Sequence, residues 1–233
     1  MGMLARHRQV AEIILNAASG YLVALGGGNA LLAHEVTDRP TQDIDVFFGK
    51  VDELADATPA IEAALAAAGY SVTPIDKTGG LTDIWEEAGE GLTEWEVATS
   101  DGEHVVQVQA GHFDVLAKPV KMKGIGPVLA LDDIAGHKAC AMATRAASRD
   151  FVDIAALQEY QRKYRWVKLI ELARERDPGL ELADFADAVR HLDRMADDRF
   201  AALLPKGRDV TWLRRHFRDW PREAPQRTTG RDG

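Results

Sequence analysis

Two aspartates at the head of an apolar segment are the residues of this chain whose types and spacing could do chemistry. Asp43 and Asp45 begin the segment DIDVFF, which ends at Phe48 and is otherwise strongly apolar. Carboxylates two residues apart on a strand point to the same face, where they repel each other unless a cation lies between them. Paired carboxylates are also how proteins hold the Mg²⁺ that accompanies nucleotide phosphates. The pair therefore predicts a metal site, with an edge position or a strand cap as the structural alternative for one of the two.

A run of three glycines precedes these aspartates. The run, 26–28, follows an apolar segment and opens an expected short helix over 29–36. The backbone N–H groups of such a turn and helix start can cradle phosphates. A dinucleotide-binding loop would need a further glycine where Leu31 stands, so the glycine run matches that motif poorly. Asn29 fits either a helix cap or a polar phosphate contact, and a plain tight turn is the bland alternative.

Further positive and polar groups could serve the same phosphates. Arg39 and Thr41 lie in the loop just before Asp43, which would place Arg39 beside the phosphates. Lys138 falls on the apolar stripe of an expected helix. A lysine there either extends its ammonium outward or reaches into a cleft, where it would offset phosphate charge. The histidines show no spacing typical of a zinc site.

The elements that must position these groups form a mixed sheet followed by helices. Alternating or continuous apolar runs predict strands, and Asp101-Gly102 between two of them is a hairpin signal. Strands are expected over 21–25, 43–48, 70–75, 93–99 and 104–110, and helices over 5–18, 29–36, 52–68 and from 131 to about 204. We therefore expect an α+β protein, with a sheet-bearing lobe over 1–128, a helical lobe over 129–221 and a disordered tail over 222–233.

Composition sets the broad class of the protein. The chain has 233 residues, 46% of them hydrophobic and 28% charged, as in an ordinary soluble protein. It has no run of the ~18 apolar residues that a membrane span needs and no signal-peptide pattern, so we expect a cytoplasmic protein. The lone Cys140 excludes an internal disulfide and a cysteine zinc cluster.

The charge of the chain is negative overall and unevenly spread. A net charge of -9 argues against a general nucleic-acid coat protein. From Lys206 to the end, however, eight Lys/Arg stand against four acids. Such a basic tail either touches phosphates or is simply solvated.

Two segments carry a resemblance to a known family. The segment GGGNALLAHEVTDRPTQDIDVFF, residues 26–48, resembles the glycine-rich, Arg-x-Thr-x-Asp-x-Asp signature of nucleotidyltransferases related to DNA polymerase beta. The segment LDDIAGHKACAMATRAASRDFVDIAAL, residues 131–157, is similar to the helix pair of the AbiEii/AbiGii toxin branch, to which the MenT-type toxins belong. Both segments occur in the family's order.

The resemblance implies a fold, an activity and a set of partners. The fold would be a minimal polymerase-beta-like nucleotidyltransferase lobe, a mixed sheet with flanking helices, followed by a C-terminal helical lobe, with the nucleotide in the cleft between the two. Members are toxins, paired with an antitoxin, that transfer a nucleotide from an NTP to an acceptor, in several cases tRNA. The implied site residues are Gly27, Gly28 and Asn29 on the triphosphate, Asp43 and Asp45 on one or two Mg²⁺, Lys138 on phosphate, and Asp150 and Asp153 supporting that site or the acceptor.

The expected third carboxylate is not at its usual place. On the strand where the family carries it, this chain has Gln107 and Gln109, and Glu94, Glu96 or Asp114 would have to serve instead. A third acid helps to activate the attacking hydroxyl in the two-metal mechanism. Two alternatives therefore stay open, a small-molecule nucleotidyltransferase of the antibiotic-modifying type and a nucleotide-binding module with impaired catalysis. A Rossmann-type oxidoreductase is a distant further one.

Overall fold

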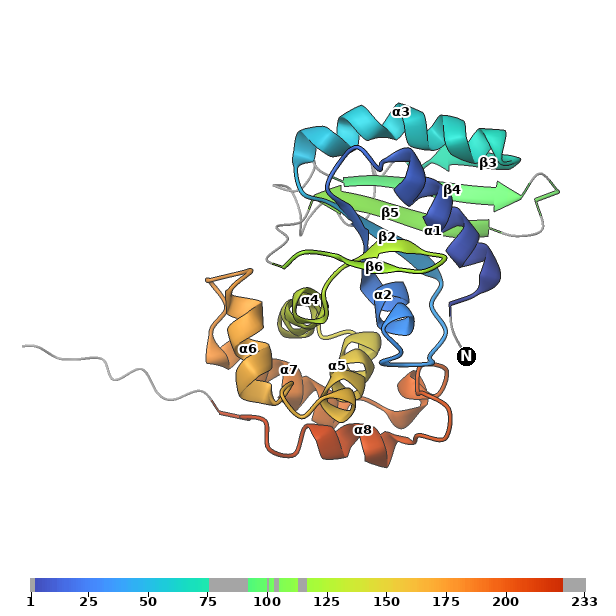
Figure 1. The fold of residues 1–233 in the computed structure, drawn as a ribbon. Helices are drawn as coiled ribbons and strands as arrows, with labels where there is room; N and C mark the ends of the chain where they lie inside the picture. The colour runs from blue at the N-terminus through green and yellow to red at the C-terminus, as the bar shows by residue number, and fades with distance from the viewer. Residues whose placement is uncertain (1–2, 76–91, 100, 103–104, 113–116, 224–233) are drawn as a thin grey trace, which may run out of the picture. The chain divides into compact units, whose positions relative to one another are not determined.

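The structure, a computed structural model, describes residues 3–75, 92–99, 101–102, 105–112 and 117–223 (Figure 1). It divides into two compact units, Met1–Ile134 and Ala135–Gly233. The first unit holds the sheet and the second holds helices, which is the α+β order expected from the sequence. Each unit is described by itself below.

A seven-stranded mixed sheet forms the centre of the first unit (Figure 1). Its strand order is β3-β4-β5-β2-β1-β7-β6, with β2 parallel to β5, β1 parallel to β7, and the other neighbours antiparallel. The strands are β1 (Val23–Leu25), β2 (Asp43–Phe48), β3 (Tyr70–Pro74), β4 (Leu92–Thr99), β5 (Val105–His112), β6 (Val120–Met122) and β7 (Gly126–Val128). The hairpin of β6 and β7 was not expected, because its strands are short and carry Lys121, Gly126 and Pro127.

Helices α1 (Ala5–Ala17) and α3 (Val51–Ala67) pack on the apolar face of this sheet, and α2 (Gly27–Ala33) connects β1 to the loop before β2. On β2 the side chains alternate between half-buried and buried, so that Ile44, Val46 and Phe48 have no exposed surface. Trp95 of β4 lies on the same face, where its indole Nε1 donates to Glu62 Oε1 of α3 at 2.9 Å. The opposite face of the sheet therefore carries the polar residues of β2, β4 and β5.

The second unit is helical. It comprises most of α4 (Leu131–Thr144), then α5 (Ser148–Tyr160), α6 (Trp166–Arg174), α7 (Leu182–Arg194), the 3₁₀ helix η2 (Asp197–Phe200) and α8 (Val210–His216). Helix α8 lies beyond the expected end of helical structure near residue 204. Its Leu213 is fully buried, and Phe217 just after it meets Phe151 of α5 edge-on, with ring centroids 5.6 Å apart. The described chain beyond residue 204, up to residue 223, therefore contributes side chains to the core of this unit.

Candidate active site

The two aspartates lie side by side on a central strand. Asp43 and Asp45 are both half-buried and share the polar face of β2, as expected from their spacing. Strand β2 lies between β5 and β1, so an edge position does not explain either carboxylate. Aspartate is disfavoured inside strands, and two on one face of a central strand indicate a function that needs them.

The glycine turn lies directly against the side chain of the second aspartate, Asp45. Gly26 donates its backbone N–H to Asp45 O at 2.8 Å, and Gly27 then turns the chain with φ +57°. A Cβ added to Gly27 would lie 1.7 Å from Asp45 Oδ2. Only glycine tolerates both this conformation and this contact. Glycine is therefore required at position 27, because the carboxylate of Asp45 occupies the space in which a Cβ would lie.

The topology of this turn excludes a dinucleotide-binding loop. Strands β1 and β2, which flank the turn and α2, are antiparallel. The dinucleotide fold requires a parallel strand–helix–strand unit. The remaining reading is that of a phosphate-cradling turn or a plain turn.

Arg39 and Thr41 pack against the same turn. A Cβ added to Gly28 would lie 2.6 Å from Thr41 Cγ2 and 3.1 Å from Arg39 Nη2. Arg39 is only 5% exposed, and its Nη1 donates to Pro40 O at 3.1 Å. The loop before β2 thus places a guanidinium beside the turn, close to the position expected from the sequence.

Asn29 holds the loop and the strand together. The helix cap is Gly26, with no side-chain cap bond, so the expectation of Asn29 as a cap is wrong. Asn29 is fully buried instead; its Nδ2 donates to Asp43 O at 2.6 Å and its Oδ1 accepts from Thr41 Oγ1 at 2.8 Å. Its side chain therefore fixes the backbone of Asp43. The residues that offer amides at the start of α2 are Gly27, Gly28 and Asn29, which precede the first intrahelical bond, from Ala30 N to Gly26 O.

His7 of α1 lies next to this network, and sequence reasoning missed it. The imidazole is 3% exposed and close to the Asn29 side chain, and its Nδ1 has no hydrogen-bond partner among the described residues. Burial, with the charge of Arg6, lowers its pKa, although the carboxylate of Asp43 acts in the opposite direction. His7 shares one helical face with Val10 and Ile14, both fully buried, and that spacing was the available signal. A buried imidazole with a lowered pKa thus lies near Asp43.

The register shows what lies beside the aspartates on the polar face. Gln107 is opposite Asp43, and Gln109 is opposite Asp45. The glutamates come one strand further on, with Glu94 opposite Gln109 and Glu96 opposite Gln107. Neighbouring strands lie ~4.8 Å apart, so each glutamate backbone is roughly 10 Å from the aspartate of its row. Among the described residues no group of three or more Asp, Glu, His or Cys comes together to hold a metal, and Asp114 lies outside them.

Two ion pairs to buried aspartates of α5 come from α4 and from Arg145 just after it, in the second unit. Lys138 Nζ lies 2.9 Å from Asp153 Oδ2, with the two side chains 10% and 0% exposed. Arg145 meets the fully buried Asp150 through two bonds, Nε to Oδ2 at 2.9 Å and Nη2 to Oδ1 at 2.8 Å. Asp150 and Asp153 thus orient the two cations, and this favours a supporting role for these two aspartates. Lys138 is therefore not directed into solvent, which was one of the two alternatives that its position left open.

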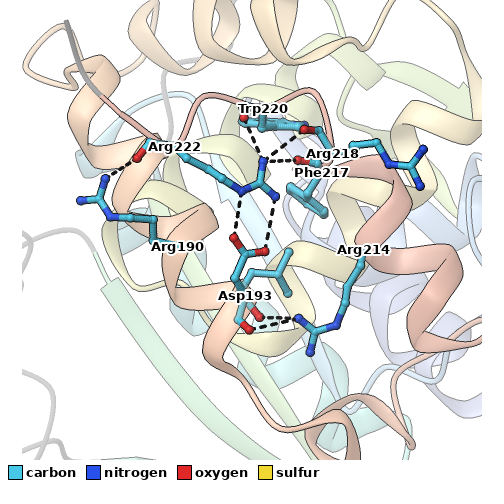
Figure 2. A network of polar contacts seen from close by, with 8 residues as sticks. Arg190, Asp193, Arg214, Phe217, Arg218, Trp220 and Arg222 are labelled. Atoms are coloured by element: carbon cyan, nitrogen blue, oxygen red, sulfur yellow. Dashed lines mark hydrogen bonds and ion pairs between the residues drawn. The ribbon is translucent and has the colours of Figure 1, made fainter.

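Two arginines of the basic C-terminal segment, Arg214 and Arg222, are built into the fold, whereas Arg215 and Arg218 are exposed (Figure 2). Arg222 binds Asp193 through Nε at 2.9 Å and donates Nη1 to the backbone oxygens of Phe217, Arg218 and Trp220. Arg214 donates to the carbonyls of Leu192 and Met195 at the end of α7 and to Asp197. Two arginines that read as a phosphate-binding tail therefore close the ends of helices.

The comparisons with known proteins settle the family. The family model described as "Nucleotidyl transferase AbiEii toxin, Type IV TA system" matches residues 10–213. The chain belongs to this family. It is therefore a nucleotidyltransferase of a toxin–antitoxin family, as the resemblance implied.

Solved structures agree with the AbiEii fold. MenT4, a nucleotidyltransferase toxin from Mycobacterium tuberculosis, superposes with a TM-score of 0.62 at 13% identity, over 92% of this chain and 82% of MenT4. JHP933 from Helicobacter pylori superposes with a TM-score of 0.56 at 18% identity, over 91% of this chain and 88% of JHP933. A search of the curated proteins finds no significant match. None of the described helices of this AbiEii protein is long and apolar enough to cross a membrane.

Proposed function

We propose that this AbiEii protein transfers a nucleotide from an Mg²⁺-bound NTP to a hydroxyl of an RNA acceptor such as tRNA, and that a cognate antitoxin counteracts it. The observation that carries the proposal is the contact between the glycine turn and Asp45. A turn shaped to admit a carboxylate brings backbone amides, which attract phosphate, next to carboxylates, which attract a cation. A nucleoside triphosphate with its metal ion is the ligand that needs both.

The residues present fit a magnesium ion. Asp43 and Asp45 supply hard oxygen donors, and Mg²⁺ is usually held by one or two carboxylates together with substrate phosphates and water. A third protein carboxylate is therefore not required for binding. When bound, the ion would neutralise phosphate charge and polarise the reacting phosphate. Two ions are possible in this family's chemistry, and Asp43 and Asp45 would be their shared ligands.

The chain's own groups then have separate tasks. The amides of Gly27, Gly28 and Asn29 would bind the triphosphate, with Arg39 and Thr41 shaping that turn. Asn29 keeps the backbone of Asp43 in place. In the helical unit Lys138 is the cation that we assign to phosphate, with Asp153 orienting its ammonium. In the reaction the acceptor hydroxyl loses its proton and bonds to the α-phosphorus, the bond to the bridging oxygen breaks, and pyrophosphate leaves.

The attacking hydroxyl still needs a base. The side chains opposite the aspartates are amides, Gln107 and Gln109, which cannot accept a proton at neutral pH. Glu94 and Glu96, each two strands from an aspartate in the same row of the polar face, are the described carboxylates that we assign as candidates for this role. If no group served, the protein would bind Mg·NTP without turnover.

The test is nucleotide transfer with single substitutions. Purified protein is incubated with each α-labelled NTP, Mg²⁺ and total RNA, using the wild type, Asp45→Asn, and Asp56→Asn on the exposed side of α3 as the matched control. We expect label on RNA with the wild type and with the control, and none with Asp45→Asn. Absence of label with all four NTPs, together with no growth defect on expression, would refute the toxin activity proposed here.

A small-molecule acceptor is the second candidate, favoured by the net charge of -9. A nucleic-acid enzyme would be expected to carry a basic stripe. Label that appears on low-mass products from a cell extract, and never on RNA, would favour this candidate. Removal of the chain after residue 204 does not separate the two, because it would delete the buried Leu213 and Phe217.

A further inference from the structure

A cavity of about 280 Å³ lies within the helical unit, where the end of α5, the start of α6 and the end of α8 meet. Its lining residues are Gln158, Arg165, Trp166, Val167, His216, Asp219 and Trp220. All belong to Ala135–Gly233, and none is among the residues assigned above to nucleotide or metal. Pockets for drug-sized ligands span ~300–1,000 Å³, so this one is suited to a single small ring system.

Two of the lining residues carry buried hydrogen-bond donors without acceptors. Trp220 Nε1 and Gln158 Nε2 are both shielded from solvent and have no hydrogen-bond partner among the described residues. Neither residue is otherwise strained: the Trp220 ring packs on Phe217, with centroids 5.4 Å apart. A buried N–H without an acceptor costs about 1–3 kcal/mol. Two such groups around one cavity indicate a ligand that supplies acceptor atoms.

The cavity also offers acceptors of its own. His216 Nδ1 lies 3.0 Å from Trp212 O, and since a carbonyl only accepts, Nδ1 carries the proton and Nε2 is an acceptor in the neutral ring. Asp219 adds a carboxylate. A ligand for this cavity must therefore present both acceptors and donors on one edge.

The wall that holds Trp220 and Asp219 is fixed in place by the network in Figure 2. Arg222 donates to the backbone carbonyls of Phe217, Arg218 and Trp220 at 3.1–3.3 Å and forms an ion pair with Asp193 of α7. The cavity is thus formed by the fold itself, independently of any ligand.

The unit that contains the cavity carries a positive net charge, against the trend of the chain, and the cavity lining itself holds one cation and one anion, Arg165 and Asp219. Residues 135–233 carry 20 Lys/Arg and 16 Asp/Glu, whereas residues 1–134 carry eight and 21. The segment leading to the cavity, QRKYRWVK over 161–168, is basic and aromatic. Arg165 is exposed beside Trp166, and Arg218 is exposed with its side chain directed away from the network (Figure 2).

We infer that this cavity takes one unpaired base of a single-stranded RNA segment, with Trp166 as the stacking surface, Trp220 and Gln158 as donors to the base edge, and Arg165 beside the backbone phosphates. A base is planar and neutral and has acceptors and donors on one edge, which matches this lining. Stacking on aromatic rings beside a basic groove is the usual mode for single strands. A simple anion would be repelled by Asp219, and an apolar ligand would leave both N–H groups without acceptors.

The inference rests on the proposed function in one respect, that the RNA held here is the acceptor. Binding itself needs neither NTP nor Mg²⁺, so the two can fail separately. Loss of binding with transfer intact would remove the cavity's role, whereas binding without transfer would count against the catalytic proposal alone.

The experiment measures binding of six-nucleotide homopolymers of A, C, G and U to the full chain without NTP or Mg²⁺, by tryptophan quenching and by anisotropy of labelled RNA. We expect Trp166→Ala to bind roughly 5- to 150-fold more weakly, the range that loss of one stacked base implies. Arg165→Glu should weaken all four RNAs and flatten the salt dependence. Arg199→Glu, an equally exposed charge reversal on η2, should bind as the wild type does.

Trp220→Phe separates recognition of the base from simple attraction to phosphate. It keeps an aromatic ring, smaller than the indole, and removes an N–H that has no acceptor among the described residues, so the variant should still fold while preference among the four RNAs diminishes. The inference is overturned if Trp166→Ala and Arg165→Glu bind like the wild type, if duplex RNA binds as tightly as single strands, or if the folded wild type binds none of the four.

Discussion

Replacing Gly27 with alanine is the sharpest test of the site. The new methyl group would be built 1.7 Å from Asp45 Oδ2 and 2.4 Å from its Cγ. The carboxylate must move, because β2 is held on both sides by the sheet. We therefore expect loss of transfer activity and weaker Mg²⁺-dependent NTP binding.

The same substitution also strains the backbone, and this effect can be measured separately. Gly27 has φ +57°, where an alanine costs about 1–2 kcal/mol. Gly69 has φ +86°, but a Cβ there meets nothing within 4 Å. Gly69→Ala thus carries the strain without the contact. Gly69→Ala should lose about 1–2 kcal/mol of unfolding free energy in urea, Gly27→Ala should lose at least as much because of the added contact, and only Gly27→Ala should lose activity.

The assays are urea unfolding, calorimetric titration with Mg·NTP, and label transfer to RNA. If Gly27→Ala retains wild-type transfer and nucleotide affinity, the close approach of turn and carboxylate has no bearing on function. If Gly69→Ala loses activity to the same degree, general destabilisation explains both, and the reasoning from the contact fails.

Three further predictions concern the buried polar groups. Lys138→Met should lower the unfolding free energy, measured in urea, by about 3–5 kcal/mol, because the fully buried Asp153 loses its ion pair with the lysine. Adding Asp153→Leu should restore much of the stability but no activity, and restored activity would contradict the part assigned to the lysine. Asn29→Leu should lower the unfolding free energy by about 1–3 kcal/mol for each hydrogen bond lost, one to the Thr41 hydroxyl and one to the Asp43 carbonyl. Nucleotide transfer should fall by more than stability does, as measured by label transfer and by unfolding in urea. Equal losses would indicate that Asn29 has a structural role only. Burial lowers the pKa of His137 to about 3, so below pH 6.5 only the unfolded chain takes up this proton, and the unfolding free energy should fall by about 1.4 kcal/mol per pH unit toward pH 4.5. In His137→Leu the slope of unfolding free energy against pH between 6.5 and 4.5 should shrink by that amount. An unchanged slope would disprove the assignment.

The parts of the fold that could be predicted from the sequence are those with strong local periodicity. The alternation of DIDVFF predicted both the bounds of β2 and the shared face of Asp43 and Asp45. Gly69 predicted the end of α3, and Asp101-Gly102 predicted the turn between β4 and β5. In each case the signal lies within a few residues of the feature it specifies.

The parts that could not be predicted depend on distant partners. The parallel pairing of β2 with β5 joins Asp45 to Gln109, and nothing near either residue specifies that register. The structural part of Asn29 was missed for the same reason, since its bonds run to the loop and strand more than ten residues later. Arg214 and Arg222 looked like a charged tail because their acceptors are carbonyls, which no sequence pattern displays.

The backbone anchors of Asp43 and Asp45 bear on the proposal that this pair holds a metal ion with few other charged residues. The carbonyl of Asp45 accepts from Gly26 N–H, and the carbonyl of Asp43 accepts from the Asn29 side chain. Both anchors act on backbone carbonyls rather than on the carboxylates. Two carboxylates that cannot move apart repel each other, and a cation would relieve that repulsion. Under the proposed function, rigid anchoring would therefore increase the affinity for a metal–nucleotide complex without a third acid, and proton removal from the acceptor would fall to a residue outside this pair.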